Sequence, residues 1–345
     1  MAYATINKPS DYFNTKLYTG NGGTLNVTGV GFQPDWVWIK SRVAAHNHHL
    51  TDSVRGINST LFSNTTGAED TGTDKLQSFN SDGFTVGSSG SINSNTDNYA
   101  SWNWLAGGTA SSNTDGSITS TVSANTTAGF SIVKFTGTGS TATVGHGLGA
   151  APDWYLVKRY NGGSGGQWNA YHSSLGATKY MLLNSTSASG TSATRWNNTE
   201  PTSSVFTVNT SGDVNDSGDL HIVYCFAEIK GYSKFGSYTG NGDANGPFIY
   251  TGFRPTFIIF KRTDGAGAWQ IHDRTRETIN DGSSPALKAD GTDAEFSKNV
   301  DFLSNGIKIR DTSSDINGAS GQTYIYMAFA EAPLVGTNNI PATAR

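Results

Sequence analysis

The segment GFQPDWVWIKSR at residues 31–42 decides the fold, because related segments occur twice more in the chain. These read APDWYLVKR at residues 151–159 and GFRPTFIIFKR at residues 252–262. Aromatic and β-branched residues at successive positions are typical of a central strand that is covered on both faces. Proline has no N–H to donate to a sheet, so the proline in each segment belongs at the entrance of a strand.

Two further patterns repeat around these segments. YTGNG at residues 18–22 returns as FTGTG at 135–139 and as YTGNG at 238–242. Each copy closes on an aromatic-rich stretch, at residues 99–104, 221–226 and 324–329. The prolines Pro34, Pro152 and Pro255 are 118 and 103 residues apart. Ordered matches at nearly constant spacing indicate an internal triplication, with modules at residues 1–108, 125–230 and 231–332 and a C-terminal arm at 333–345.

Short apolar runs with turn signals every ~8–12 residues predict an all-β fold. We therefore expect three tandem antiparallel β-sandwich modules of jelly-roll-like form. The Gly/Ser/Thr-rich stretches at residues 107–124 and 162–166 are expected to be linkers or loop tips. Residues 333–345 carry few large apolar side chains and are expected to be either a frayed tail or an arm that docks on a neighbouring subunit.

The composition excludes several classes of protein. The 345 residues carry a formal charge of −4, and only 14% of them are charged, which argues against binding to nucleic acid. The 42 glycines argue against a helical protein, and the 11% aromatic content argues against disorder. The longest apolar runs are far shorter than the ~20 residues that span a bilayer, so no membrane insertion is expected.

The only cysteine, Cys225, lies in an apolar run and is expected to be a buried core residue. A single cysteine allows no intrachain disulfide. The first 13 residues lack the basic and then apolar pattern of a signal peptide. We expect a soluble protein of a reducing compartment.

The most suggestive residues for catalysis follow the repeated strands. Each copy ends its strand on lysine and arginine, and Asp52, His172 or Asp273 stands downstream. The partner changes type between copies, and no copy offers two carboxylates in a fixed relation for acid–base chemistry. Surface ion pairs at strand ends are the preferred interpretation, and we expect no enzymatic activity and no catalytic residues.

Two places in the sequence carry residue types that could ligate a metal ion. His46, His48 and His49 cluster in the first copy only, without a carboxylate at helical spacing. The segment that begins at Asp213 resembles the start of a calcium loop, but Tyr224 stands where the twelfth position requires a bidentate glutamate. We expect no metal and no cofactor, although the sequence leaves open a calcium ion near Asp213.

Trp196 differs from the other tryptophans because it lies in a polar stretch rather than in a repeated strand. Its ring could stack on a sugar or pack into a subunit interface. The candidate surface-binding or interface residues are Trp196, Arg195, His48 and His49.

The segments YTGNG, GFQPDWVWIKSR, HHLTDSVRG (48–56), SFNSDGFTVGS (78–88) and GTNNIPATAR (336–345) resemble a family of tailed-phage virion proteins common in marine phages. Members of that family are described as structural or tail-fibre-like, with no assigned activity, so the resemblance implies no catalytic residues. It implies a virion location, after assembly in the cytoplasm of the host bacterium.

The expected function is a non-enzymatic bacteriophage structural protein, most simply a tail-fibre or tail-tip component that contacts the host surface. The alternatives are a capsid (head) decoration or cement protein and a virion-associated protein that binds or cleaves glycans. The expected partners are other virion proteins, copies of the same chain in a trimer or hexamer, and a host cell-surface glycan. No coiled-coil heptad repeat or triple-β-helix shaft indicates a whole fibre.

Overall fold

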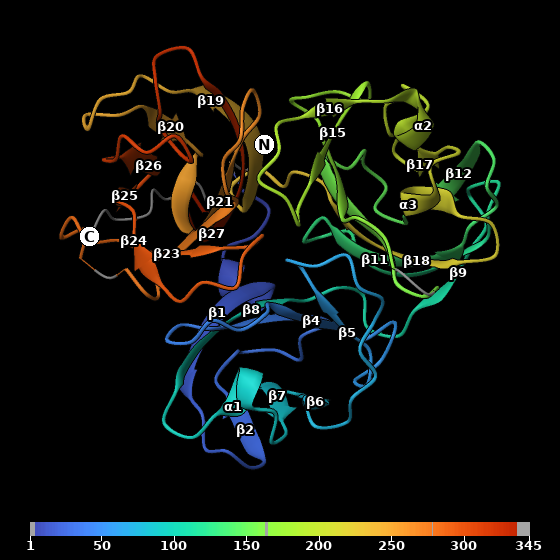
Figure 1. Ribbon diagram of the computed structural model, residues 1–345, viewed down its shortest axis with the longest axis horizontal. Helices are drawn as coiled ribbons and strands as arrows, with labels where there is room; N and C mark the ends of the chain where they lie inside the picture. The colour runs from blue at the N-terminus through green and yellow to red at the C-terminus, as the bar shows by residue number, and fades with distance from the viewer. Residues whose placement is uncertain (1–3, 163–164, 278, 337–345) are drawn as a thin grey trace.

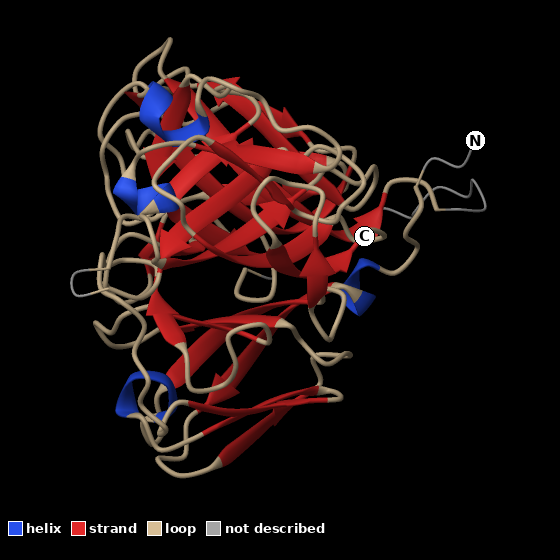
Figure 2. Ribbon diagram, turned by 90° about the vertical axis from the view of Figure 1, so that its right-hand side faces the viewer, coloured by secondary structure: helices blue, strands red, loops and turns tan. Residues whose placement is uncertain are grey.

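Three β-sandwiches surround a common centre in the computed structural model, which describes residues 4–162, 165–277 and 279–336 (Figure 1). Module 1 contains strands β1–β8, module 2 contains β9–β18 and module 3 contains β19–β27. Figure 2 shows that strands dominate the molecule and that its helices are short. The predicted all-β fold of three antiparallel sandwich modules is therefore confirmed.

The main sheets of the three modules share the order of five strands, and modules 2 and 3 add further strands at the edges. The order for module 2 is given from the opposite edge. In module 1 the order is β1 (Phe13–Thr19), β8 (Asn98–Trp104), β3 (Trp36–Ser41), β4 (His49–Asp52) and β5 (Thr60–Phe62). In module 2 it is β16 (Gly190–Thr191), β15 (Lys179–Leu182), β14 (Asn169–His172), β13 (Trp154–Arg159), β18 (Leu220–Phe226), β11 (Phe130–Thr136), β10 (Ser120–Asn125) and β9 (Ser111–Asn113). In module 3 it is β19 (Ser233–Thr239), β27 (Thr323–Pro333), β21 (Phe253–Arg262), β22 (Gln270–Asp273), β23 (Pro285–Lys288) and β24 (Phe296–Ser297).

A smaller sheet covers the outer face of each main sheet. The small sheets are β2 (Leu25–Thr28), β7 (Gly83–Val86) and β6 (Leu76–Asn80) in module 1, β12 (Ala142–Gly145) and β17 (Val205–Val208) in module 2, and β20 (Phe248–Tyr250), β26 (Gly306–Ile309) and β25 (Val300–Leu303) in module 3. The helices are η1 (Pro9–Asp11), α1 (Gly90–Asn93), α2 (Ala193–Trp196) and α3 (Gly212–Asn215). None of the helices in the described ranges has the length and apolar character to cross a membrane.

Strand β3 shows why the repeated segments are apolar at every position. Trp36 and Trp38 face a core shared by all three modules, whereas Val37 and Ile39 face the small sheet of module 1. Strands β13 and β21 alternate in the same way between the shared core and their own small sheets. The predicted coverage on both faces is confirmed, and the neighbouring modules supply the second cover.

Three equivalent aromatic residues from the closing strands meet at the centre of the shared core. The ring of Trp104 lies 6.3 Å from that of Phe226 and 5.9 Å from that of Phe329, and the last two rings are 5.9 Å apart. All three side chains are buried. Because each module contributes one ring, the core cannot form within a single module.

Equivalent hydrogen bonds join the modules into a closed ring. The indole N–H groups of Trp168 and Trp269 donate to the carbonyls of Phe62 and Leu182, both at 2.9 Å. The histidine at the equivalent position, His48, contacts the carbonyl of Lys288 through Nε2 at 2.9 Å. These bonds connect module 2 to module 1, module 3 to module 2, and module 1 to module 3.

A buried asparagine fixes the loop that follows β1, β11 and β19. The Oδ1 atoms of Asn93, Asn215 and Asn317 accept hydrogen bonds of 2.8 Å from the backbone N–H groups of Asn21, Thr138 and Asn241. The repeated YTGNG-type segments are therefore held by one buried side chain per module.

Two segments differ from the sequence-based expectations or lie partly outside the structure. Residues 107–124 were expected to be a linker or loop tip, but β9 and most of β10 form within them and pair beside β11, because Val122 buries its side chain in the core of module 2. Of the predicted C-terminal arm, Pro333 ends β27 opposite Phe253, and residues 337–345 lie outside the described residues. Cys225 is buried, as predicted.

Candidate functional site

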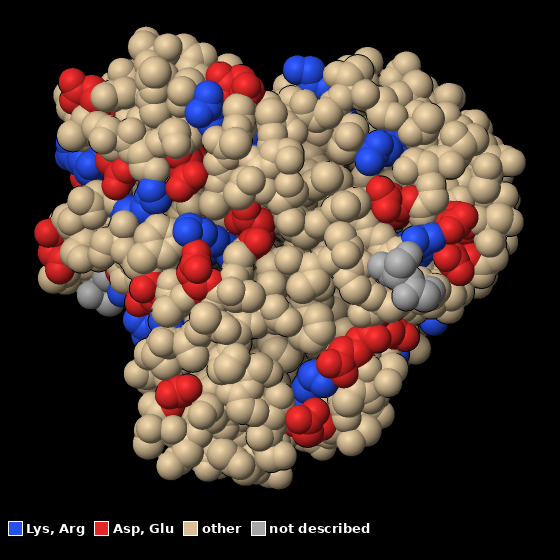
Figure 3. All heavy atoms as spheres, in the orientation of Figure 1, with Lys and Arg blue, Asp and Glu red and all other residues tan. Residues whose placement is uncertain are grey.

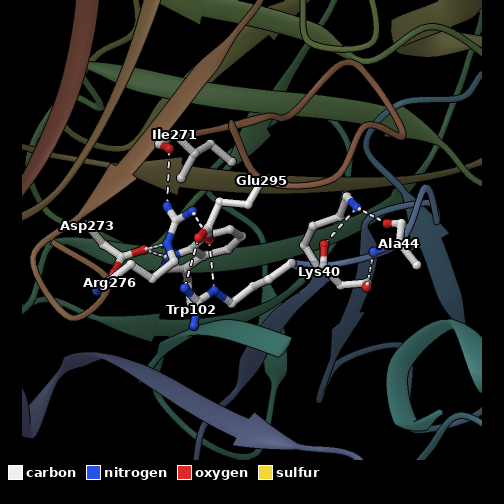
Figure 4. A network of polar contacts seen from close by, with 9 residues as sticks. Lys40, Ala44, Trp102, Ile271, Asp273, Arg276 and Glu295 are labelled. Carbon is white, nitrogen blue, oxygen red and sulfur yellow. Dashed lines mark hydrogen bonds and ion pairs between the residues drawn. The ribbon is translucent and has the colours of Figure 1, made fainter. Parts of the chain in front are cut away.

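A network of charged side chains lies where module 3 meets module 1 (Figure 4). Arg276 donates to the Asp273 carboxylate at 2.6 Å, and both side chains have no exposed surface. Arg276 also donates to Glu295 at 3.1 Å, and the indole of Trp102 in module 1 donates to Asp273 at 3.0 Å. This network joins charges from β22 and the following turn to the closing strand of module 1.

Arg42, which directly follows β3, completes the network. Its guanidinium binds both carboxylate oxygens of Glu295 at 2.8 Å, a bidentate geometry that strengthens such a pair. Burial alone would raise the pKa of Glu295, but the hydrogen bond from Arg42 and the charge of Arg276 outweigh it and lower that pKa. Glu295 is therefore ionised at neutral pH and bridges two arginines from different modules.

The other two junctions vary the same arrangement. Between modules 1 and 2, Asp52 accepts from Arg55 at 2.7 Å and from the hydroxyl of Tyr224 at 2.8 Å. Between modules 2 and 3, the equivalent position holds His172, whose Nε2 lies 3.2 Å from the carbonyl of Tyr326. The position that holds Asp52, His172 or Asp273 therefore faces a neighbouring module in each of the three copies.

The three repeated lysines are also buried in these junctions. Burial lowers the pKa of Lys40 and Lys261 to about 8 and that of Lys158 to about 7. The ammonium groups of Lys158 and Lys261 donate to Thr66 and Thr186 in the neighbouring modules, at 2.8 and 3.1 Å. The prediction of surface ion pairs is wrong for these lysines and for Asp52 and Asp273, because the ring encloses their side chains. It holds for Arg159 and Arg262, which pair with the partly exposed carboxylates of Asp216 and Asp264.

The buried charges at the junctions are paired with groups of the protein itself. The Asp52–Arg55 and Asp273–Arg276 pairs are at most 1% exposed, so a substrate cannot reach either carboxylate. Their hydrogen bonds run to guanidinium, indole and phenol groups of the protein itself. This arrangement suits a structural role in joining modules.

Stability should fall as the pH drops below about 6.5, because buried histidines resist protonation. Burial lowers the pKa of His172 and His221 to about 4 and that of His49 and His272 to about 3. Between about pH 6.5 and 4 the unfolded chain binds protons that the folded chain does not, so each histidine lowers the free energy of unfolding by up to about 1.4 kcal/mol per pH unit. Asp290, whose pKa is raised by burial to about 6, opposes this trend.

Urea unfolding of the parent chain and of His272→Phe between pH 7.5 and 4.5 tests the prediction. The difference in unfolding free energy between the two proteins should shift in favour of the variant as the pH falls. A difference that stays constant over this range would contradict the assignment of His272 as a buried neutral group.

Two of the residues predicted for surface binding lie in α2. Trp196 is fully buried, and its indole donates to the carbonyl of Lys179 at 3.1 Å. The prediction of a tryptophan in a polar loop is wrong, because α2 turns the ring into the core of module 2, edge-on to Tyr155. Arg195 is 13% exposed and lies over the ring of Tyr180 at 3.5 Å.

The two predicted histidines are buried elsewhere, in module 1. His48 accepts a hydrogen bond of 2.8 Å from the indole of Trp38 through Nδ1, which leaves Nε2 to donate to Lys288. His49 packs edge-on against Phe62 at 4.9 Å. As placed, neither His48 nor His49 presents a binding surface, and His48 forms part of the junction between modules 1 and 3.

The segment considered for calcium uses its carboxylates for internal contacts. Asp213 accepts from the backbone N–H of Gln167 at 3.0 Å, and Asp219 lies 3.3 Å from Arg159. Within residues 4–162, 165–277 and 279–336, no three His, Cys, Asp or Glu side chains gather in a way that could hold a metal ion.

A candidate binding surface that faces outward is formed by two aromatic side chains on β20, Phe248 and Tyr250. We call this pair the aromatic face of module 3. Phe248 is 45% exposed and Tyr250 is 54% exposed, while Ile249 between them is buried against the main sheet. At the equivalent positions module 1 carries Asn26 and Thr28, and module 2 carries Thr143 and Gly145. This pair was not among the residues predicted from the sequence. An alignment of the three copies would reveal it, because only module 3 has aromatic residues at these two positions.

A cleft of about 330 Å³ lies beside the aromatic face. Tyr250 lines this cleft, together with Lys234 and Glu228, which form an ion pair at 2.8 Å. An aromatic ring next to exposed polar groups is a combination that suits sugars, which present both an apolar face and hydroxyls.

The visible surface carries little charge. Figure 3 shows lysines, arginines and carboxylates in small mixed groups that are separated by wide uncharged areas. No broad basic area that would suit a phosphate backbone is visible on this face.

Comparison with known proteins gives one match. The model of a family described as "Domain of unknown function (DUF7483)" matches residues 8–333. None of the curated proteins and none of the solved structures matches the chain.

Proposed function

We propose that this chain, which belongs to the family described as a domain of unknown function (DUF7483), is a non-enzymatic structural and adhesive protein of a bacteriophage particle. In this role the ring of three modules is a rigid support, and the aromatic face of module 3 contacts a glycan on the host surface. The resemblance of the sequence to phage virion proteins supplies the setting.

The aromatic face is the observation that carries the proposal. Phe248 and Tyr250 stand two positions apart on one strand, and both are about half exposed. Apolar side chains exposed next to one another often mark a binding site. The buried charges of the junctions support a non-enzymatic role, because they are engaged between modules.

A head decoration protein is the second candidate, and the pseudo-threefold ring favours it. Three similar modules around one axis could cover three equivalent surfaces of a capsid lattice. Cryo-electron microscopy of the virion distinguishes the two roles. Density at the tail periphery supports adhesion, density over the capsid lattice supports decoration, and absence from the particle contradicts both.

Replacing the two aromatic residues with their equivalents in module 1 tests the role of the aromatic face. The double variant Phe248→Asn/Tyr250→Thr should reduce binding of the purified chain to host cells about tenfold or more, since an aromatic anchor of an interface contributes more than about 1.4 kcal/mol. Both side chains are about half exposed, so the unfolding midpoint should change little.

Val43→Thr is the matched control, because Val43 is 51% exposed but lies in module 1. It should leave cell binding unchanged. Equal binding by the parent chain and the double variant would show that the aromatic face is not the contact surface.

A further inference from the structure

The junction between modules 2 and 3 lacks the side chains that fill the other two junctions. Backbone hydrogen bonds establish the equivalence: Glu69 N–H donates to Tyr160, Ser189 N–H to Thr263 and Glu295 N–H to Arg42, at 2.8–2.9 Å. The residue that donates is a glutamate at two junctions and Ser189 at the junction between modules 2 and 3. The residue that accepts has a large side chain at the first two junctions, Tyr160 or Arg42, and is Thr263 at the third.

The arginine that spans the other junctions is also missing. Arg55 and Arg276 follow their aspartates by three residues, whereas Leu175 stands at that distance from His172. Arg55 lies over the ring of Tyr160 at 5.6 Å, and Arg276 over that of Trp102 at 5.6 Å. The junction between modules 2 and 3 has therefore replaced three large groups with Leu175, Thr263 and Ser189.

A pocket of about 350 Å³ opens at this junction. Leu175 and Thr263 line it, together with Tyr238, Ile325 and Lys179. This volume is at the lower end of the range for small-molecule sites and is large enough for one sugar unit. At each of the other two junctions, the guanidinium group of an arginine lies at the place that corresponds to this pocket.

Four polar side chains of the pocket are available to a ligand. Lys179 Nζ and the hydroxyls of Ser174, Ser237 and Thr239 make no side-chain hydrogen bond within the described part of the chain. Leu175, Ile325 and the ring of Tyr238 offer an apolar wall beside them. Hydroxyls beside an apolar wall match a pyranose ring, which has hydroxyls at its rim and C–H groups on its faces.

The charge of the residues that line the pocket indicates which kind of sugar it would bind. No aspartate or glutamate lines it, so a cationic ligand would meet no counterion, whereas Lys179 offers an ammonium to an anion. We propose that the pocket between modules 2 and 3 binds a sugar unit that carries a carboxylate, with Lys179 paired to the carboxylate. This site is separate from the aromatic face and does not depend on the proposed virion role.

Saturation-transfer NMR of the full chain with glucuronate, and with glucose as the neutral counterpart, tests the proposal. Glucuronate should give the stronger signal, and Lys179→Gln should weaken its binding about tenfold through loss of one charge-assisted hydrogen bond. Thr239→Trp should abolish binding, because the indole would fill the pocket from an exposed position.

Thr136→Trp is the matched control, since Thr136 is exposed at the equivalent position of module 2, beside a junction that already contains Arg55. It should leave glucuronate binding unchanged. Equal signals from glucose and glucuronate would overturn the assignment of Lys179. Binding that survives Thr239→Trp, or no signal at ~10 mM sugar, which would fill most of a site with a millimolar Kd, would overturn the site itself.

Discussion

Replacing Trp104 with alanine should lower the free energy of unfolding by about 3–5 kcal/mol, the usual cost of removing a large aromatic side chain from a core. Trp104 is fully buried and contacts the equivalent rings of Phe226 and Phe329 from the other modules. Because the cavity would open in the shared core, all three modules should lose stability together. Urea unfolding followed by tryptophan fluorescence and by circular dichroism measures the effect.

The two probes should report one coincident transition in both the parent chain and Trp104→Ala. Val43→Ala, which truncates an exposed apolar residue of the same module, should shift the midpoint little. A variant in which module 1 unfolds first while the others keep their original midpoint would contradict a shared core.

Arg276→Leu should cost about 3–5 kcal/mol, because it leaves the buried carboxylate of Asp273 without its cation. Both side chains of this pair are fully buried, so solvent does not screen the lost interaction. Glu295 would lose one of its two arginines in the same change. The midpoint of chemical unfolding at pH 7.5 measures the loss.

Lys8→Ala is the control, because it breaks an ion pair with Asp11 in which the lysine side chain is 70% exposed, and it should change stability by about 0.5 kcal/mol or less. The double variant Asp273→His/Arg276→Leu reproduces the pair found in module 2, His172 and Leu175. It should recover part of the loss, since no unpaired charge then remains buried. A double variant less stable than Arg276→Leu would contradict this account.

The strands of the main sheets could be predicted because their pattern is local. The segment from Trp36 to Ile39 is apolar at each position, and only a strand with cover on both faces explains this. What covers the second face was not predictable, since the partners of Trp36 in the shared core include Tyr224 and Phe130, which lie far along the chain.

The polar ends of these strands were misassigned for a related reason. Lysine, arginine and aspartate at the end of a strand are usual on a surface, and only closure of the ring buries Lys158 and Asp273. Trp196 was misplaced because a four-residue helix, α2, has no periodic signal that would separate it from a loop.

The ring has a consequence for assembly. Each module offers one face to the module after it and a different face to the module before it, which is a head-to-tail contact. Contacts of this kind grow into open filaments unless the rotation between neighbours closes them. In this protein the ring closes at the third module, within one polypeptide. The faces that could otherwise join molecules into a filament are therefore buried between modules of the same chain, where a second molecule cannot bind them.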